Sequence, residues 1–221
     1  MTYSLIIFDL DGTLLDTSEG ICQSCLYAAN KLNLQDKSQQ TISNMIGQPI
    51  YDIYLNEYKL DSEMAETAVS IFRREYDRYG KTLARLYPGI QELLHLLKEE
   101  GKIIAIVTMK PASTAEDMLG DFNILNNIDA IYGRGDDKTM SKKRMIELCM
   151  EKYHVVSRNC VVIGDSEHDR LGACETNVDF IGVTYGYGFK GEKDVTSSYH
   201  TYVVNNPQEL SEILKEKSSI N

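Results

Sequence analysis

The chain has 221 residues, which is long enough for a full domain with a smaller one attached. Its hydrophobic content of 43% can fill a core and is too high for a disordered chain. Its net charge of −10, with Lys and Arg scattered, argues against a nucleic acid polymer or an anionic membrane as partner. Five cysteines are too few for a disulfide scaffold, and neither a secretory signal nor a long apolar run is evident, so we expect a cytoplasmic, reduced protein.

The first hydrophobic run is followed directly by a pair of acids. Residues 5–8 read as a strand buried on both faces of a parallel sheet, and Asp9 and Asp11 come just beyond it. Alternation along an extended backbone places both side chains on one side, where they repel each other unless a cation or a shared proton intervenes. Because the ligands are hard oxygens, the pattern favours Mg²⁺ together with a phosphate, and Gly12 permits the tight turn that follows.

Residues 17–87 show helical periodicity and no convincing strand. Asp16 and Glu19 have the spacing of a capping box, which predicts a helix start, and further helices are expected at 49–58 and 61–79. Strand and helix signals alternate on either side of this stretch. The sequence therefore predicts a helical domain at 17–87, inserted into an α/β domain made of 1–16 and 88–221.

The rest of the chain alternates between the two element types. We expect this segment to complete a parallel sheet, and two of its buried strands deliver Thr108 and Asp165 at their ends. The expected strands are 103–107, 130–132, 161–163, 180–183 and 202–204, and the expected helices are 88–100, 111–122, 141–153, 166–175 and one beginning at 207.

The segment FDLDGTLLDT, residues 8–17, resembles the first motif of the haloacid dehalogenase-like (HAD) hydrolase superfamily. The later segment GACETNVDFIGVTYGYG resembles its phosphoglycolate phosphatase-like members, whose helical cap is inserted after the first strand. The resemblance implies a Rossmann-like, HAD-like core with the insert as cap. It also implies that Asp9 is a nucleophile that becomes an aspartyl-phosphate and that Asp11 is the general acid and base.

Two further strand ends resemble later motifs of the superfamily. IIAIVT resembles the second motif, which implies that Thr108 donates its hydroxyl to the phosphoryl oxygens. VVIGDSEHD resembles the G-D-x-x-x-D motif, which implies that Asp165 completes a Mg²⁺ site with Asp9 and Asp11, and that Asp169 orients the lysine or a metal-bound water. The alternative is that Asp169 is simply an acidic residue in the first turn of a helix, where its charge interacts favourably with the helix dipole.

The lysine that the superfamily uses beside the nucleophile is harder to place. The segment GRGDDKTMSKKRMIELCMEK departs from the common K-P pattern and resembles a variant in which the lysine opens a helix after a Ser-x pair. This reading selects Lys143. Lys142 is the alternative and Lys138 the third candidate, and two of the three are ordinary surface lysines.

These motifs together predict a Mg²⁺-dependent phosphatase acting on small phosphate monoesters such as phosphoglycolate, sugar phosphates or nucleotides. The alternative is a β-phosphoglucomutase-like phosphohexomutase, against which Asp169 argues, and a more remote one is a signalling phosphoacceptor or a non-catalytic domain. The C-x-x-C formed by Cys22 and Cys25 fits two ordinary helix thiols better than a redox site.

Substrate specificity is expected to come from the insert. Gln48, in the loop around Gly47 and Pro49, and Arg74, next to Arg73, are the residues we expect to meet the leaving group, although most such arginines are simply solvated. We expect a small phosphorylated metabolite as partner, with neither a nucleic acid polymer nor a membrane, and a monomer or a homodimer.

Overall fold

The computed structural model describes residues 3–43, 45–46, 49–135, 137, 139–195 and 201–219. It divides into two compact units. The first, which we call the core, comprises Met1–Leu15 and Leu86–Asn221, and the second, the helical insert, comprises Asp16–Arg85. Within the described part of the chain, none of the helices has the length and apolar character needed to span a membrane.

The core is built on a six-stranded sheet in the order β5-β4-β1-β6-β7-β8, and each pair of neighbouring strands is parallel. This confirms the predicted α/β class. The strands are β1 (Leu5–Phe8), β4 (Ile103–Thr108), β5 (Ala130–Gly133), β6 (Cys160–Gly164), β7 (Asp179–Val183) and β8 (Thr201–Val204).

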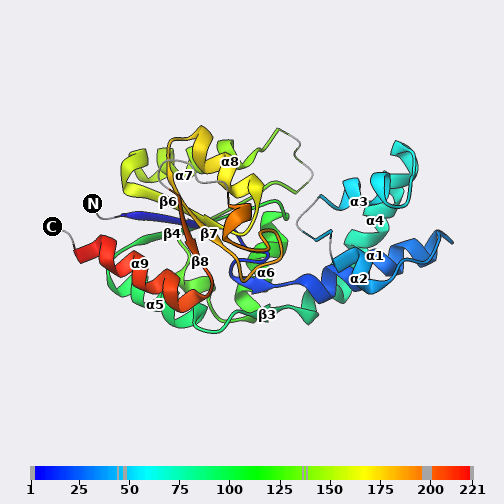
Figure 1. Cartoon of the computed structure of the whole chain (residues 1–221), viewed down its shortest axis with the longest axis horizontal. Coiled ribbons are helices and arrows are strands. Elements are labelled where there is room, and N and C mark those ends of the chain that lie inside the picture. Colours follow the sequence, from blue (N-terminus) through cyan, green and yellow to red (C-terminus); the bar gives the residue numbers. More distant parts are fainter. Residues whose placement is uncertain are drawn as a thin grey trace. The chain divides into compact units, whose positions relative to one another are not determined.

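Helices cover both faces of this sheet. Figure 1 shows α7 and α8 on one face and α5 and α9 on the other, while α6 packs against β5. Such coverage explains why the central strands are nearly continuous apolar runs. The core helices are α5 (Ile90–Glu99), α6 (Ala112–Asp121), α7 (Lys142–Tyr153), α8 (Glu167–Glu175) and α9 (Pro207–Ser219).

The strand order reverses at β1, which lies between β4 and β6. Phe8, the last residue of β1, lies opposite Ile106 of β4 and Ile163 of β6. Both β4 and β6 end at most two residues beyond these positions. The chain therefore leaves all three strands at the same edge of the sheet. In open α/β sheets the crevice at such a reversal is where ligands bind.

The insert contains the helices that the sequence predicts but starts differently. Thr17 is the N-cap of α1 and makes no side-chain cap bond, and Asp16 Oδ1 instead accepts hydrogen bonds from the Ser18 amide at 3.0 Å and the Ser18 hydroxyl at 2.6 Å. The expected Asp16–Glu19 capping box is therefore wrong. The insert helices are α1 (Ser18–Lys31), α2 (Gln39–Ser43), α3 (Ile50–Asn56) and α4 (Ser62–Arg78).

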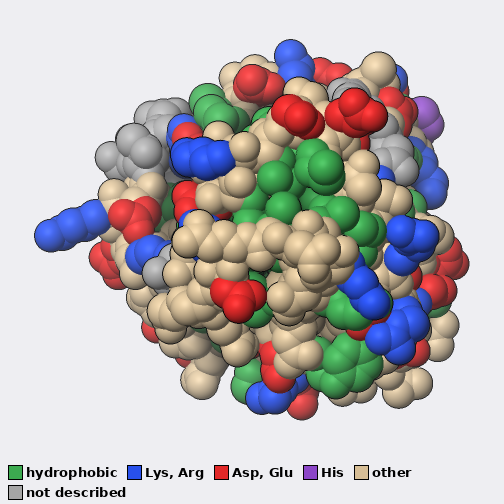
Figure 2. Space-filling model, turned by 90° about the vertical axis from the view of Figure 1, so that its right-hand side faces the viewer, with side chains coloured by type: hydrophobic (Ala, Val, Ile, Leu, Met, Phe, Trp, Pro, Cys, Tyr) green, Lys and Arg blue, Asp and Glu red, His purple; other side chains and the backbone are tan. Residues whose placement is uncertain are grey.

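The chain passes between the two units at two short strands. These are β2 (Leu15–Asp16) and β3 (Arg85–Leu86), which pair with each other in a two-stranded sheet. Both acidic and basic side chains occur on the face shown in Figure 2, where several basic ones lie along the right-hand edge and hydrophobic ones gather near the middle.

A close approach inside the insert allows a test of its packing. A Cβ placed on Gly20 of α1 would lie 2.0 Å from the Gly80 carbonyl oxygen. We expect Gly20→Ala to lower the free energy of unfolding by about 1–3 kcal/mol, measured by urea denaturation, because the backbone must shift. Gly120→Ala on α6, where a Cβ meets nothing within 4 Å, is the control and should be neutral or stabilising by up to about 1 kcal/mol. Equal effects would contradict the packing argument.

Candidate active site

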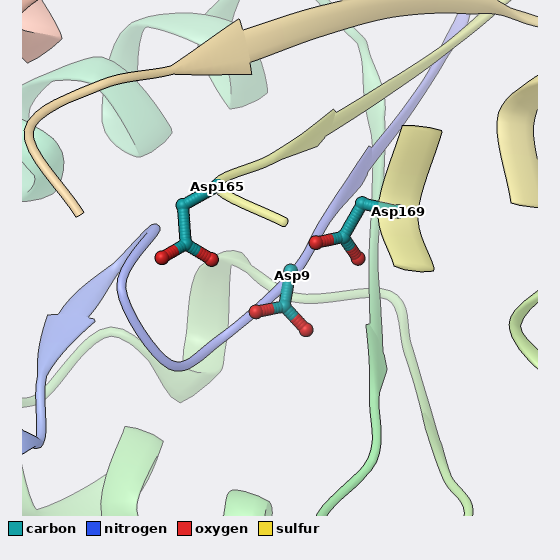
Figure 3. A group of neighbouring side chains, drawn as sticks. All are labelled: Asp9, Asp165 and Asp169. Atoms are coloured by element: carbon teal, nitrogen blue, oxygen red, sulfur yellow. The ribbon is translucent and has the colours of Figure 1, made fainter. Parts of the chain in front are cut away.

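Three aspartates converge at the edge of the sheet where β1 and β6 end. Asp9 follows β1, Asp165 follows β6, and Asp169 lies in the first turn of α8 (Figure 3). All three are buried, and each offers an oxygen within 4.8 Å of the others. Hard carboxylate oxygens in this arrangement fit Mg²⁺, because like charges this close and this buried call for a cation.

The lysine at this site is Lys142, the alternative in the sequence analysis, and not Lys143. The Lys142 ammonium donates to Asp9 Oδ1 at 2.5 Å and to the Val107 carbonyl at 2.7 Å, and it forms an ion pair with Asp169 at 2.6 Å. Lys142 is buried, whereas Lys143 is exposed. The prediction of Lys143 is therefore corrected to Lys142.

Helix phase explains the correction. Ser141 is the N-cap of α7, and its side chain accepts a hydrogen bond from the Arg144 amide at 3.2 Å, so Lys142 is the first helical residue. A Cβ on Gly172 of α8 would lie 2.9 Å from the Lys142 Cβ, which shows how closely α8 covers this side of α7. Successive helical residues differ by about 100°, so Lys143 points elsewhere.

Burial and neighbouring charges shift the pKa values at this site. Burial, with repulsion from Asp169, raises the pKa of Asp9 well above its usual range, and Lys142 opposes this. Burial lowers the pKa of Lys142, but the Asp169 and Asp9 carboxylates outweigh it and raise that pKa above its ordinary value. The ammonium therefore stays charged, and the surplus negative charge makes the site a place for a cation.

Asp165 is held by the backbone of the loop that follows β7. Its Oδ2 accepts hydrogen bonds from the amides of Tyr187 and Gly188, each at 2.9 Å. Burial, followed by repulsion from Asp169, raises the pKa of Asp165 to about 7, although these two amides oppose the shift. This loop lies within the segment GACETNVDFIGVTYGYG, for which the sequence predicted no contact with the site.

Asp169 serves both its helix and the lysine. Its Oδ2 accepts from the Ser166 amide at 3.2 Å and the Ser166 hydroxyl at 2.5 Å, which completes a capping box at the start of α8. Its other oxygen faces Lys142. Asp169 therefore has both of the contacts that the sequence offered as alternatives: one oxygen caps the start of α8, and the other contacts the lysine.

Asp11 lies apart from the three aspartates. Its Oδ1 pairs with the Lys110 ammonium at 2.5 Å, and its carboxylate is not among the oxygens that gather with Asp9. Lys110 follows the end of β4, and its amide donates to the Thr108 hydroxyl oxygen at 3.2 Å. Thr108 is buried at that strand end, as expected. Lys110 could not be found from the sequence, because its contact with Asp11 joins residues far apart in the chain.

The predicted substrate residues fall in the helical insert. Arg74 is exposed on α4, and its role in substrate binding stays a prediction. Gln48 and the third lysine candidate, Lys138, lie outside the described residues. Cys22 and Cys25 are buried free thiols on α1, as two ordinary helix cysteines would be.

A family model described as haloacid dehalogenase-like hydrolase matches residues 6–183, which contain the aspartates of the site, Lys142 and Thr108. The chain belongs to this hydrolase family. A predicted phosphatase from Clostridium acetobutylicum has a crystal structure that superimposes with a TM-score of 0.88 at 33% identity, covering 98% of this chain and 100% of that one.

Named relatives of this HAD hydrolase include several phosphatases. A 5'-nucleotidase of Pseudomonas aeruginosa is 33% identical over 87% of each chain. A phosphoglycolate phosphatase of Colwellia psychrerythraea is 31% identical over 84% of this chain and 86% of its own. Another relative, the tyrosine-protein kinase PtkA of Mycobacterium tuberculosis, is 31% identical over 88% of this chain and 66% of its own. The phosphatases confirm the predicted enzyme class, a phosphoric monoester hydrolase.

The raised pKa of Asp165 predicts how the stability of the metal-free protein depends on pH. Because the folded state holds this proton up to about pH 7 and the unfolded state releases it near 3.8, the folded state binds more protons in that window. Stability should fall as pH rises through it, with a slope of at most about 1.4 kcal/mol per unit for one proton. Urea denaturation in a chelator measures this slope.

Asp165→Asn is the matched variant for this measurement. It should show a shallower slope over the same window, because an amide does not titrate. Any cation that binds this site in the folded state should raise the stability of the wild type at pH 7 and above, by mass action. An identical slope in the variant would show that other groups determine the pH dependence.

Proposed function

We propose that this HAD hydrolase is a Mg²⁺-dependent phosphatase of small phosphate monoesters that works through an aspartyl-phosphate on Asp9. The observation that carries the proposal is the environment of Asp9. This buried carboxylate ends β1, contacts the Lys142 ammonium through one oxygen, and lies in one group with Asp165 and Asp169.

The chemistry assigned to the side chains divides one hard substitution into two easier ones. A carboxylate oxygen of Asp9 attacks phosphorus, and the bond from phosphorus to the ester oxygen breaks while Asp11 donates a proton to that oxygen. Asp11 then accepts a proton from the water that attacks the aspartyl-phosphate, and inorganic phosphate leaves as Asp9 is regenerated. Asp11 suits proton exchange because its side chain is one-fifth exposed at the edge of the site.

Lys142 and Thr108 are assigned to the transferring phosphoryl group. The Lys142 charge is already fixed beside Asp9 by three oxygens, so it is oriented before substrate arrives. Thr108 ends the neighbouring strand and would offer its hydroxyl. Asp169 is a positioning residue in this scheme, because it holds Lys142.

Asp9 and Asp165 are the residues that would hold Mg²⁺. When bound, the ion neutralises negative charge on both the phosphate and Asp9, and so permits an anionic nucleophile to approach an anionic group. The sequence analysis also assigned the Asp11 side chain to the metal. One oxygen of Asp11 pairs with Lys110 instead, so we assign Asp11 to proton transfer and leave it out of the metal site.

Small phosphorylated metabolites are the substrate class we infer, including phosphoglycolate, sugar phosphates and nucleoside monophosphates. The named activities of the phosphoglycolate phosphatase and the 5'-nucleotidase support this range. We also propose that the protein acts in the reducing cytoplasm, which fits its five free cysteines.

The lysine assignment can be tested by comparing two adjacent residues. Lys142→Met should reduce kcat by at least ~10²-fold, because it removes a charge aimed at the phosphoryl group. Lys143→Met, which alters an exposed neighbour on the same helix, should leave kcat almost unchanged. Steady-state kinetics with an aryl phosphate measure both, and equal losses would contradict the assignment.

The nucleophile is tested by Asp9→Asn in a panel of small phosphate esters assayed with Mg²⁺. The wild type should hydrolyse several of them, while the variant should fold and show no turnover, because an amide does not form the acyl-phosphate. Mass spectrometry of acid-quenched wild type should find phosphate on Asp9. Residual hydrolysis of a few per cent without deamidation would remove Asp9 from this role, and glucose 6-phosphate formed from β-glucose 1-phosphate would favour the mutase instead.

A further inference from the structure

The loop that follows β7 encloses one oxygen of Asp165. The amides of Tyr187 and Gly188 both donate to Oδ2, each at 2.9 Å. A carboxylate oxygen has two lone-pair directions for acceptance, and these two donors use both. The other oxygen, Oδ1, is the one left to act as a ligand.

Backbone packing closes the same oxygen sterically. A Cβ placed on Gly12 would lie 2.2 Å from Asp165 Oδ2, and one on Gly186 would lie 2.5 Å from it. The backbones of both glycines therefore lie directly against this oxygen, so an ion has no room on that side. Hydrogen bonding and packing independently restrict Asp165 to a single ligand atom.

This loop is anchored at both ends. The Tyr185 hydroxyl donates to the Thr13 carbonyl at 3.0 Å, and the Phe189 amide donates to the Asp165 carbonyl at 2.7 Å. The Phe189 ring is buried against Phe180. The two amides that hold Oδ2 therefore lie on a turn whose position is fixed by the core.

We propose that this turn, residues 185–189, determines the metal specificity of the site, because it keeps Asp165 monodentate and so selects Mg²⁺ over Ca²⁺. Mg²⁺ requires near-octahedral geometry with single oxygens, whereas Ca²⁺ accepts six to eight ligands and often takes both oxygens of a carboxylate. The inference rests on the proposed function only in requiring that a divalent cation binds at Asp165.

The test is calorimetric titration of Mg²⁺ and, separately, Ca²⁺ into metal-free wild type, Gly186→Ala and Gly191→Ala. The Gly186 Cβ pushes the turn away from Asp165, so Mg²⁺ affinity should fall about tenfold or more, as for other residues that orient metal ligands. Ca²⁺ affinity should be maintained, because Oδ2 becomes available. Gly191, where a Cβ meets nothing within 4 Å, is the control and should keep the wild-type ratio of affinities.

The inference can also be tested on the wild type alone, so that the result does not depend on whether a variant folds. Amide hydrogen exchange followed by NMR should show Tyr187 and Gly188 protected in the Mg²⁺-loaded protein. With Ca²⁺ they should be protected equally well, because the turn keeps Oδ2 from either ion. Faster exchange of these two amides with Ca²⁺ than with Mg²⁺, or an unchanged ratio of affinities in folded Gly186→Ala, would overturn the inference.

Asp165→Asn separates this inference from the proposed function. If that variant loses affinity for both ions while Gly186→Ala keeps the wild-type ratio, the metal site stands and the role of the turn is refuted. If Asp165→Asn binds Mg²⁺ as tightly as wild type, the metal assignment in the proposed function fails, and the inference fails with it.

Discussion

Mutual repulsion among buried carboxylates is the constraint on which this site depends. Asp9, Asp165 and Asp169 lie close together away from water, where an uncompensated charge is very costly. Lys142 offsets part of that cost by contacting two of them at once, which is why its own buried charge is tolerated. The Ser141 N-cap, which sets where α7 begins, therefore places the Lys142 charge where the aspartates need it.

The sheet topology brings these charges together. Because β1 lies between β4 and β6, their carboxyl ends deliver Asp9, Thr108 and Asp165 to one edge, and the first turn of α8 adds Asp169. The raised pKa values of Asp9 and Asp165 show that the arrangement costs stability when the carboxylates are ionised. A protein that maximised stability would not keep this cluster, whereas one that binds a cation recovers the cost on binding.

The sequence was sufficient where local pattern determines position. Asp9 and Asp165 each follow an apolar run that is recognisable as a buried strand, so their place at the sheet edge could be predicted. Lys142 and Lys143 are adjacent, and only the N-cap at Ser141 and the approach of α8 at Gly172 decide which one faces inward. The contact of Lys110 with Asp11 joins residues 99 positions apart, and no local pattern reports such a pair. The capping box expected at Asp16 fails because Asp16 belongs to β2 instead.

The partners of the site carboxylates differ in charge, and that difference indicates where a cation is most needed. Lysine ammonium groups contact Asp9 and Asp169 on one side and Asp11 on the other. The hydrogen bonds to Asp165 come instead from the neutral amides of the β7 loop, which orient it without cancelling its charge. Fixed dipoles of this kind keep a ligand in place and leave its negative charge available. Asp165 is thus oriented by neutral groups, and its negative charge would be left for a metal ion to neutralise.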